Sequence, residues 1–367
     1  MSSKYRVFTI NPGSTSTKIA IFDNNDKLFE ASITHRQEDL VVFPDVQDQL
    51  EYRTEMVERT VASNGFDMAD VDVYASRGGG LVSCTSGVYE ISDLLVAHAA
   101  TGMSGIHPAQ LGSQIIRKFA NRYGKPAFVV NPPDVDEFCE VARVSGLQGI
   151  YRESHTHTLN QKEIARRFCL SKDLNYDNVN LIICHIGGGI SITAHKNGRM
   201  IDSNDIIKGS GPMSPTRVGD IPYMNVLELA FSGDYTKKEL SDRLNRNGGL
   251  SDYFGTSDVR DVLALIKDGD SYAKIILDGM IYQIAKYVGA MAVALHGRVN
   301  AIILTGGISN NAFVTDSITN YISWISEVTV MPGEFELEAL ASGAISVMQG
   351  QVMTKEYTGM PVWNGFK

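Results

Sequence analysis

The residues best suited to chemistry near the N-terminus stand in one short loop between two apolar runs. The runs lie around Phe8 and Ile21 and predict the two strands of a hairpin. The loop crowds an amide, several hydroxyls, backbone N–H groups and an ammonium into a volume that suits a phosphate-sized anion. Its polar members and glycine are Asn11, Gly13, Ser14, Thr15, Ser16, Thr17 and Lys18. The alternative is a polar turn whose hydroxyls cap its own backbone, because the Gly-Lys-Ser/Thr ending of a P-loop is absent.

The same pattern recurs twice further along the chain. Residues Leu181 to Lys196 again give an apolar run, a loop and an apolar run, and Ala301 to Asn311 lead from an apolar run into a glycine pair. The second loop contains His185, Gly187, Gly188, Gly189 and Ser191. The first two hairpins lie about half a chain apart, so we expect two related halves. A chain of 367 residues is also long enough for roughly two domains.

Two arginines stand in glycine-rich loops. Arg77 precedes Gly78, Gly79 and Gly80 directly after the short predicted strand at 71–76, and Arg217 lies in the Gly/Pro/Ser loop at 208–220. Loops of this composition do not build cores, and the glycines let the backbone approach a ligand closely. Surface arginines on flexible turns are the alternative interpretation.

Two histidines stand at predicted helix starts, where negative charge is favoured. His107 and Pro108 open a helix that runs to Tyr123, and His157 precedes a helix at 159–169. His107 could equally be a helix cap. His155 and His157 have metal-like spacing, but no further ligand stands at a useful distance, so we favour His157 as a hydrogen-bond donor to a phosphoryl group.

Carboxylates cluster in two places. Asp134, Asp136 and Glu137 follow the predicted strand at 126–130, where ligands of α/β sheets bind, although a solvated acidic turn has the same composition. Glu334 and Glu336 stand at the start of the last predicted helix, 335–349. Asp258 with Arg260 reads either as a helix start or as a nucleotide contact.

Composition excludes several classes of protein. A formal net charge of −9 without a Lys/Arg run argues against a nucleic-acid surface. The most apolar helical stretch, 272–296, is interrupted by charges, and the N-terminus lacks a signal pattern, so we expect no membrane and a cytoplasmic location. Four scattered cysteines fit reduced thiols without a role.

The order of these motifs resembles the acetate kinase group of the sugar kinase, Hsp70 and actin superfamily, and within it the butyrate kinase branch. The resemblance spans nearly the whole chain. It rests on NPGSTSTKIAIF at 11–22, HIGGGISITA at 185–194 and LTGGISNN at 304–311, together with RGGG at 77–80, HTLNQKEIARR at 157–167 and GPMSPTRVGD at 211–220.

The resemblance implies an α/β fold of two ribonuclease H-like (actin-like ATPase) domains with a nucleotide cleft between them. The expected ranges are 1–152 plus about 337–367, and 153–336. The implied reaction transfers a phosphoryl group between ATP and a short-chain carboxylate, butyrate or a branched analogue, with ATP formation as the expected direction. ATP and Mg²⁺ are the implied cofactors, and a homodimer or larger homo-oligomer is the implied assembly.

The resemblance also implies roles for individual residues. For the carboxylate and the transferring phosphoryl group, the matching residues are Arg77, His107, His157 and Arg217. For the phosphates they are Asn11, Ser14, Ser16, Lys18, His185, Gly187, Gly188, Gly189 and Ser191. For the adenosine they are Asp258, Arg260, Gly306, Gly307 and Asn310. For the metal it is Glu336 or Glu334, and we expect Asp136 as a second metal ligand.

One position departs from the family pattern. The family has a carboxylate directly after the strand at 126–130, where this chain has Asn131. Either Asn131 contributes a neutral oxygen or Asp134 or Asp136 supplies the charge. An acetate or propionate kinase, a sugar kinase with Asp136 as base, and a nucleotide-dependent switch of the same fold stay as alternatives, because fold does not fix function. The sequence does not give the lining of the acyl pocket.

Overall fold

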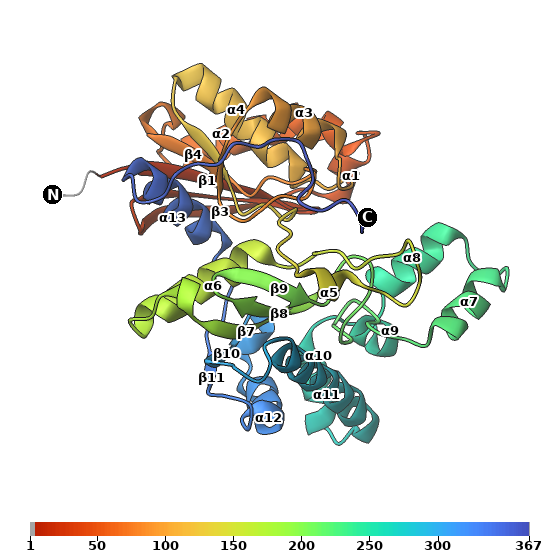
Figure 1. The fold of residues 1–367 in the computed structure, drawn as a ribbon. Helices are drawn as coiled ribbons and strands as arrows, with labels where there is room; N and C mark the ends of the chain where they lie inside the picture. Colours follow the sequence, from red (N-terminus) through yellow and green to blue (C-terminus); the bar gives the residue numbers. More distant parts are fainter. Residues whose placement is uncertain (1–3, 367) are drawn as a thin grey trace. The chain divides into compact units, whose positions relative to one another are not determined.

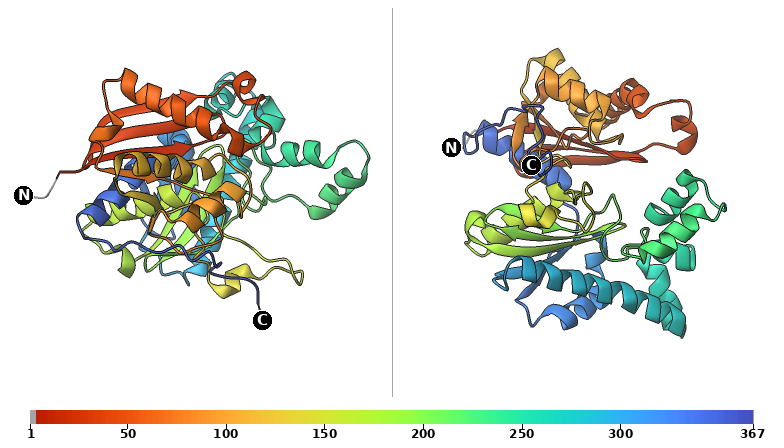
Figure 2. Two further views of the ribbon diagram at one scale, coloured as in Figure 1. Left: turned by 90° about the horizontal axis from the view of Figure 1, so that it is seen from above. Right: turned by 45° about the vertical axis from the view of Figure 1, so that its right-hand side comes forward.

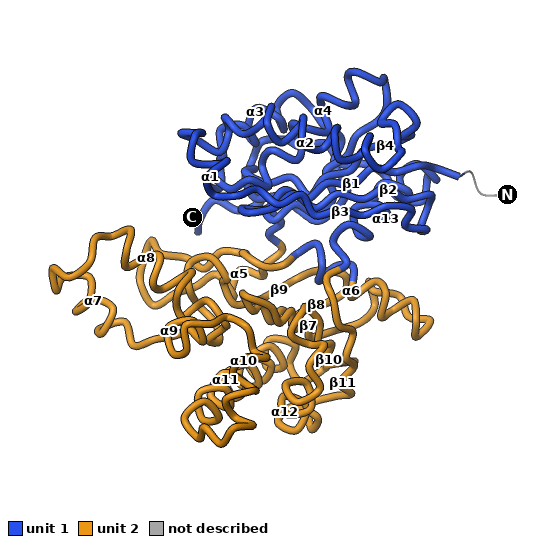
Figure 3. The backbone as a smooth tube through the Cα atoms, turned by 180° about the vertical axis from the view of Figure 1, so that it is seen from behind, with its two compact units in different colours: residues 1–136, 158–163, 335–367 blue, residues 137–157, 164–334 orange. Residues whose placement is uncertain are grey.

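The computed structural model describes residues 4–366, which form two compact units (Figures 1 and 3). Unit 1 comprises residues 1–136, 158–163 and 335–367, and unit 2 comprises 137–157 and 164–334. Residues 137–152, which we expected in the first domain, pack on unit 2. The amide of Cys139 donates to the carbonyl of Ile201, and the Glu137 carboxylate accepts from the amide of Met200.

Unit 1 is built on a six-stranded sheet of order β3-β2-β1-β4-β6-β5. Strands β1, β2 and β3 are antiparallel neighbours, whereas β4 and β6 run parallel to β1. The strands are β1 (Arg6–Pro12), β2 (Ser16–Asp23), β3 (Asp26–Thr34), β4 (Val73–Ser76), β5 (Val88–Glu90) and β6 (Ala127–Val130).

Helices cover both faces of this sheet (Figure 1). α2 (Leu50–Ser63), α3 (Asp93–Thr101) and α4 (Gln110–Tyr123) lie on one face, and α13 (Glu336–Met348) packs on β1, β4 and β6 from the other. α4 can approach the sheet closely because Gly112 has no side chain: a Cβ there would lie 2.2 Å from the Ser76 hydroxyl. The end of α4 confirms the predicted stop, since Gly124 adopts the left-handed conformation.

Unit 2 repeats the order of the first five strands of the unit 1 sheet, β3-β2-β1-β4-β6. Its five-stranded sheet has the order β11-β10-β7-β8-β9, in which β7, β8 and β9 are antiparallel and β10 and β11 run parallel to β7. The strands are β7 (Asn180–Ile186), β8 (Ile190–Lys196), β9 (Arg199–Ser203), β10 (Ala301–Thr305) and β11 (Val328–Val330). The repeated order bears out the expectation of two related halves, and both predicted hairpins are present.

The core of unit 2 joins its sheet to the long helix α11 (Ser271–Ala294) and to α12 (Ala312–Ile322). α6 (Thr158–Ser171) begins in unit 1 and continues in unit 2. The other helices are α1 (Gln37–Leu40), α5 (Glu140–Arg143), α7 (Tyr223–Phe231), α8 (Lys237–Asn245), α9 (Leu250–Phe254) and α10 (Val259–Lys267). Short 3₁₀ turns are η1 (Val46–Gln49), η2 (Met68–Asp70), η3 (Tyr176–Asn178) and η4 (Gly307–Asn310).

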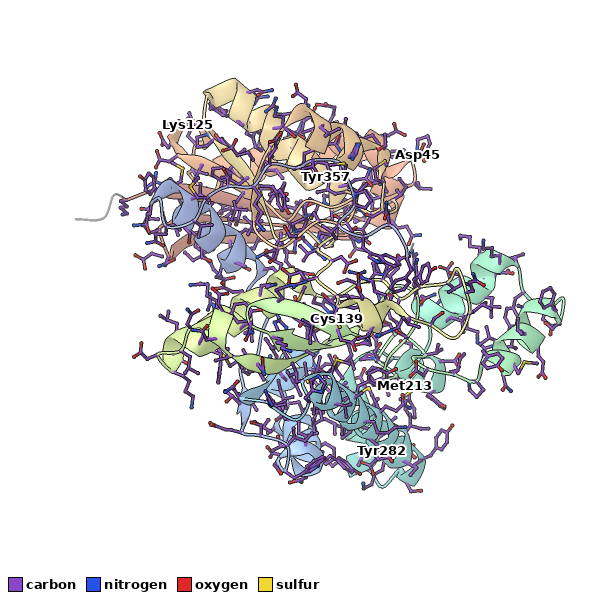
Figure 4. All side chains as sticks on the ribbon, in the orientation of Figure 1. Asp45, Lys125, Cys139, Met213, Tyr282 and Tyr357 are labelled. Atoms are coloured by element: carbon purple, nitrogen blue, oxygen red, sulfur yellow. The ribbon has the colours of Figure 1, made fainter. Side chains whose placement is uncertain are left out.

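Within residues 4–366, no helix combines the length and the apolar character needed to cross a membrane. All four cysteines carry free thiols; three are buried, and Cys139 is half-buried (Figure 4).

Candidate active site

The first predicted phosphate loop joins β1 to β2. Asn11 pairs with Lys18 across the hairpin, and the amide of Gly13 closes the turn on the carbonyl of Ser16 at 2.7 Å. No acceptor in the described chain takes the amide N–H groups of Ser14 and Thr15. Unused backbone donors next to hydroxyls suit an anion, so the geometry fits the phosphate role better than a self-capped turn.

Asn11 and Glu336 lie together at the edge of the unit 1 sheet. The Asn11 amide nitrogen donates to the Glu336 carboxylate, and the Asn11 Oδ1 is buried with no hydrogen-bond partner among the described residues. Glu336 begins α13, whose preceding amide, at Phe335, is held by the Asn160 side chain at 2.9 Å. An uncommitted amide oxygen beside a carboxylate is a donor set that suits Mg²⁺, which takes oxygen ligands and keeps water and phosphate in its other positions.

Arg53, which sequence reasoning missed, lies behind the first loop. Its side chain is 0% exposed, and its five hydrogen bonds match its five N–H groups. Nη1 donates to the carbonyl of Gly13 at 2.9 Å and to the Thr17 hydroxyl at 3.0 Å, and Nη2 donates to the carbonyl of Ser14 at 3.4 Å. The remaining bonds go to Gln49.

The charge of Arg53 is not neutralised by an acid, because no carboxylate in residues 4–366 pairs with it. Burial lowers its pKa to about 10, so the side chain is still cationic at neutral pH. The guanidinium holds the loop carbonyls inward and adds positive potential behind the loop. The signal in the sequence was an arginine on the apolar stripe of a helix, in line with Val57 and one turn after Leu50.

His35 completes the support of the first loop. Its Nε2 lies 2.8 Å from the Thr17 hydroxyl, and its Nδ1 lies 3.3 Å from the hydroxyl of Tyr52. Burial, followed by the charge of Arg53, lowers the pKa of His35 to about 4. The ring is therefore neutral at neutral pH.

Arg77 follows β4, and its amide donates to the carbonyl of Ile10 at the end of β1. Gly78, Gly79 and Gly80 all have positive φ, and a Cβ at Gly78 would lie 2.7 Å from the Val129 side chain. The glycines thus allow a turn that other residues would strain, and the loop places Arg77 next to the strand that carries Asn11.

His107 lies two residues before Ala109, the N-cap residue of α4. Its Nδ1 accepts from the amide of Ala109 at 3.1 Å, and the side chain lies at the surface. The contact holds the turn that leads into α4, and the predicted role near the substrate stays a prediction.

Asn131, which stands where the family has a carboxylate, is held by a hydrogen bond within unit 1. Asn131 adopts a positive φ of 42°, and its side-chain oxygen accepts from the amide of Gly87 at 2.8 Å. Asp134 is buried, accepts from the Ser104 hydroxyl, and has one carboxylate oxygen with no hydrogen-bond partner in the described chain. Burial raises the pKa of Asp134 to about 6. Asp134 therefore has a carboxylate oxygen that is available to a ligand. For Asp136, the backbone amide donates to the carbonyl of Cys84.

In unit 2 the second loop joins β7 to β8 and lies against two histidines. The ring of His157 stacks on that of His185 at 3.8 Å between centroids, and its Nδ1 lies 2.8 Å from the Ser191 hydroxyl. His185 Nε2 lies 3.8 Å from the Glu334 carboxylate. The structure thus brings together three of the predicted residues, from β7, β8 and the start of α6.

Arg217 completes this cluster. Its Nη1 is buried with no hydrogen-bond partner among the described residues, and burial lowers its pKa. A Cβ at Gly189 would lie 2.6 Å from this nitrogen and 3.8 Å from the His157 ring. Arg217, Gly189 and His157 therefore surround one small volume that only a glycine backbone leaves open.

The loop that carries Arg217 is fixed to the second phosphate loop and to the core. The carbonyl of Gly188 accepts from the hydroxyls of Ser214 at 2.7 Å and Thr216 at 2.9 Å. The amide of Met213 (Figure 4) donates to Gln283 on α11, and its side chain joins the hydrophobic core. A buried donor on a well-fixed loop is suited to a ligand with negative charge.

The predicted adenosine residues lie in two places. Gly306, at the end of β10, has a φ of 91° and comes so close to β7 that a Cβ would lie 2.5 Å from the Ile186 carbonyl oxygen. Gly307 and Asn310 form η4 directly after it. Asp258 caps α10 and pairs with Arg260 at 2.5 Å, and these bonds lower the pKa of Asp258 to about 2. The pairing supports the helix-start interpretation of Asp258, and its nucleotide role stays a prediction.

The fold is that of known phosphotransferases. An acetate kinase from Porphyromonas gingivalis superimposes with a TM-score of 0.76 at 20% identity, covering 94% of this chain and 100% of that one. A propionate kinase from Francisella tularensis superimposes with a TM-score of 0.73 at 18% identity, covering 93% and 99%. These two likenesses show the fold that this chain shares with solved kinases.

Sequence comparison gives the family. The acetokinase family matches residues 148–327. Butyrate kinase 2 of Clostridium acetobutylicum is 38% identical over 354 residues, covering 96% of this chain and 99% of that protein. The chain belongs to the acetokinase family, as the resemblance in its motifs predicted.

Proposed function

We propose that this chain transfers a phosphoryl group between ATP and a short-chain carboxylate, with butyrate or a branched analogue as the acid. The main supporting observation is the cluster in unit 2, in which a buried Arg217 nitrogen has no hydrogen-bond partner among the described residues and lies beside His157 and Gly189. A buried cation with an unused donor is costly unless a ligand oxygen completes it. The name of the Clostridium relative supports the choice of acid.

The reaction needs no strong general acid or base. A substrate carboxylate is already ionised; its oxygen forms a bond to the γ-phosphorus while the bond to the β,γ-bridging oxygen breaks, and that electron pair leaves with ADP. Catalysis is then alignment and charge neutralisation. Arg77 would orient the carboxylate, and Arg217 with His157 would stabilise the equatorial oxygens.

We assign the remaining residues to the phosphates and the metal. In unit 1, Asn11, Ser14, Ser16 and Lys18 would serve the terminal phosphate; in unit 2, Gly187, Gly188, Gly189 and Ser191 would serve the β-phosphate. Asn11 and Glu336 would hold Mg²⁺, which neutralises phosphate charge when bound. Asp134 is the better candidate for the charge that Asn131 lacks, because it has an uncommitted oxygen.

We further propose a cytoplasmic homo-oligomer. Four free thiols support a reducing compartment. Helix α7 is rich in apolar residues and buries none of them, which supports self-association.

The test is hydroxylamine trapping with ATP, magnesium and carboxylates from acetate to valerate, including isobutyrate. Hydroxamate formation that peaks at four carbons is the expected result. A peak at two or three carbons would move the chain to the acetate or propionate kinases, and no hydroxamate with any acid would overturn the carboxylate kinase proposal.

A further inference from the structure

The chain after α13 forms a strap along the edge of the unit 1 sheet. We call residues 353–362 the C-terminal strap, and Figure 2 shows it within the dark blue chain that runs from α13 across unit 1. β5 is the edge strand of that sheet. The amide of Lys355 donates to the carbonyl of Val88 at 2.8 Å, and the amide of Glu90 donates to the carbonyl of Lys355 at 3.3 Å. The strap thus adds a short parallel pairing beyond β5.

Tyr357 (Figure 4) is the buried residue of the strap. It is 3% exposed, and its hydroxyl accepts from the amide of Val82 at 2.9 Å and lies 2.9 Å from Nδ1 of His98 on α3. Burial raises the pKa of Tyr357 to about 12, so the hydroxyl keeps its hydrogen at neutral pH. A phenol can accept one hydrogen bond and donate another, so both functions of this hydroxyl have a partner.

The segment that follows the Arg77 loop is held by two other parts of unit 1. Residues 81–84 come directly after Arg77 and its three glycines. The amide of Cys84 donates to the carbonyl of Asp134 at 3.0 Å, and the Cys84 carbonyl accepts from the amide of Asp136 at 2.8 Å. The chain after β6 is therefore the first support of this segment.

The strap is the second support. The amide of Val82 donates to the Tyr357 hydroxyl, and the carbonyl of Ser83 accepts from the amide of Val362 at 3.0 Å. Two consecutive residues after the glycines are thus bonded to the strap, one through a side chain and one through the backbone.

The strap is itself fixed before and after Tyr357. Before it, Nζ of Lys355 donates to the carbonyl of Ser86 at 2.6 Å. After it, Gly359 has a φ of 71° and packs so closely on α3 that a Cβ would lie 3.0 Å from the Leu94 side chain. The tyrosine hydroxyl is therefore presented from a backbone that unit 1 holds in place.

The Arg77 loop depends on external support because its glycines do not fix its path. The glycines at 78–80 have positive φ and no side chains to pack, so their backbone can take many directions. The carbonyl of Gly80 accepts from the amide of Met103 at 2.9 Å, and the bond of the Val82 amide lies two residues further on. Loss of the bond at Val82 would let the loop, with Arg77 at its start, change position.

We propose that Tyr357 is a positioning residue for the carboxylate substrate, because through Val82 it fixes the loop that carries Arg77. This inference rests on the proposed function, in which Arg77 orients the acid. Arg77 is assigned to the acid and not to the nucleotide, so the strap should act selectively on the KM for the acid.

Substrate-specific KM values test the proposal. Tyr357→Phe in the full-length chain keeps the buried ring and removes the hydroxyl, so the Val82 amide loses this acceptor. The KM for butyrate should rise about tenfold, the scale of one buried hydrogen bond, while the KM for ATP should stay within about twofold of the wild-type value. Initial rates of hydroxamate formation, with one substrate varied and the other saturating, give both quantities.

Tyr74→Phe is the matched control. Tyr74 is also buried, and its hydroxyl donates to the carbonyl of Met68 at 2.7 Å, away from the strap. This variant should lose a similar unfolding free energy in urea titrations and keep both KM values of the wild type.

Lys355→Met is a second variant of the strap. It removes the Nζ bonds to Thr85 and Ser86 and leaves Tyr357 in place. Because the strap is loosened but the hydroxyl is kept, the KM for butyrate should rise by a smaller factor, about threefold.

The outcomes separate this inference from the function on which it rests. Wild-type protein that forms no hydroxamate with any acid overturns the proposed function. With an active wild type, an unchanged KM for butyrate in Tyr357→Phe, or an equal rise of both KM values, overturns the positioning role. A KM for butyrate that rises as much in Tyr74→Phe also overturns it, because the effect then follows the lost stability and not the Arg77 loop.

Discussion

The loops of the β1–β2 and β7–β8 hairpins occupy equivalent positions in two sheets of the same strand order, yet an arginine serves each loop differently. Arg53 uses all five N–H groups inside the protein, on the loop carbonyls, Thr17 and Gln49. Arg217 leaves Nη1 buried and unpartnered among the described residues, beside Gly189. A buried arginine with every donor satisfied fixes a loop, whereas one with an unused donor is prepared for a ligand.

The loops also differ in how they present donors. The first loop has hydroxyls and Lys18 on a turn whose carbonyls accept from Arg53. The second loop has glycines, and its Gly188 carbonyl accepts from two hydroxyls. Duplicated topology therefore gives two loops, each proposed to bind phosphate, that rely on different chemistry. The following substitutions test that difference.

Arg217→Ala should have the largest effect. It removes the donor assigned to the transition state, so kcat should fall about 10²- to 10³-fold while the affinity for ATP changes little. Steady-state kinetics by hydroxamate trapping and nucleotide binding by calorimetry measure the two quantities. An unchanged kcat would contradict the assignment of this loop to the active site.

Gly189→Ala should reduce kcat by about tenfold or more, because the new Cβ lies 2.6 Å from Arg217 Nη1 and must displace it. Gly188→Ala is the matched control in the same loop, since a Cβ there meets nothing within 4 Å. Equal kinetics for the two variants would show that Arg217 does not depend on this close approach.

Arg53→Gln should lower kcat/KM for ATP by about tenfold, because an uncharged side chain cannot hold both loop carbonyls or add positive potential. Arg53→Lys keeps the charge and should recover part of the loss. The control is Thr54→Val on the same helix, whose hydroxyl bonds only the Leu50 carbonyl. Urea titration gives the unfolding free energy of each variant. If Thr54→Val is destabilised to the same extent as Arg53→Gln and loses as much activity, Arg53 contributes only to stability.

The smallest effect concerns pH and stability. The folded-state pKa of His35, about 4, lies below the ordinary value of 6.5, so folding favours the neutral ring. This contribution is complete above pH 6.5 and is lost as the pH falls from 6.5 toward 4. Wild-type protein should therefore lose more unfolding free energy than His35→Gln between pH 7.5 and pH 4.5 in urea titrations. Parallel losses would show that His35 is not held neutral by the fold.

Local patterns were enough to predict both hairpins, the end of α4 at Gly124 and the family, because strand alternation, glycine turns and motif order are properties of short segments. The structure places Arg217 beside the second loop. Asp258 shows the limit, since a helix cap and a ligand contact need the same residue types at the same positions.

The sequence by itself determined the kinds of groups that are proposed to meet a phosphate and the segments that carry them. Only the tertiary structure decided which groups still have an unused donor or acceptor. In the sequence, Arg53 is one charge on an amphipathic helix and Asp134 is one acid in a polar turn. In the structure, packing buries both side chains. Burial and partner count depend on contacts between distant segments, here α2 with the first hairpin and residue 104 with residue 134, which no local pattern encodes.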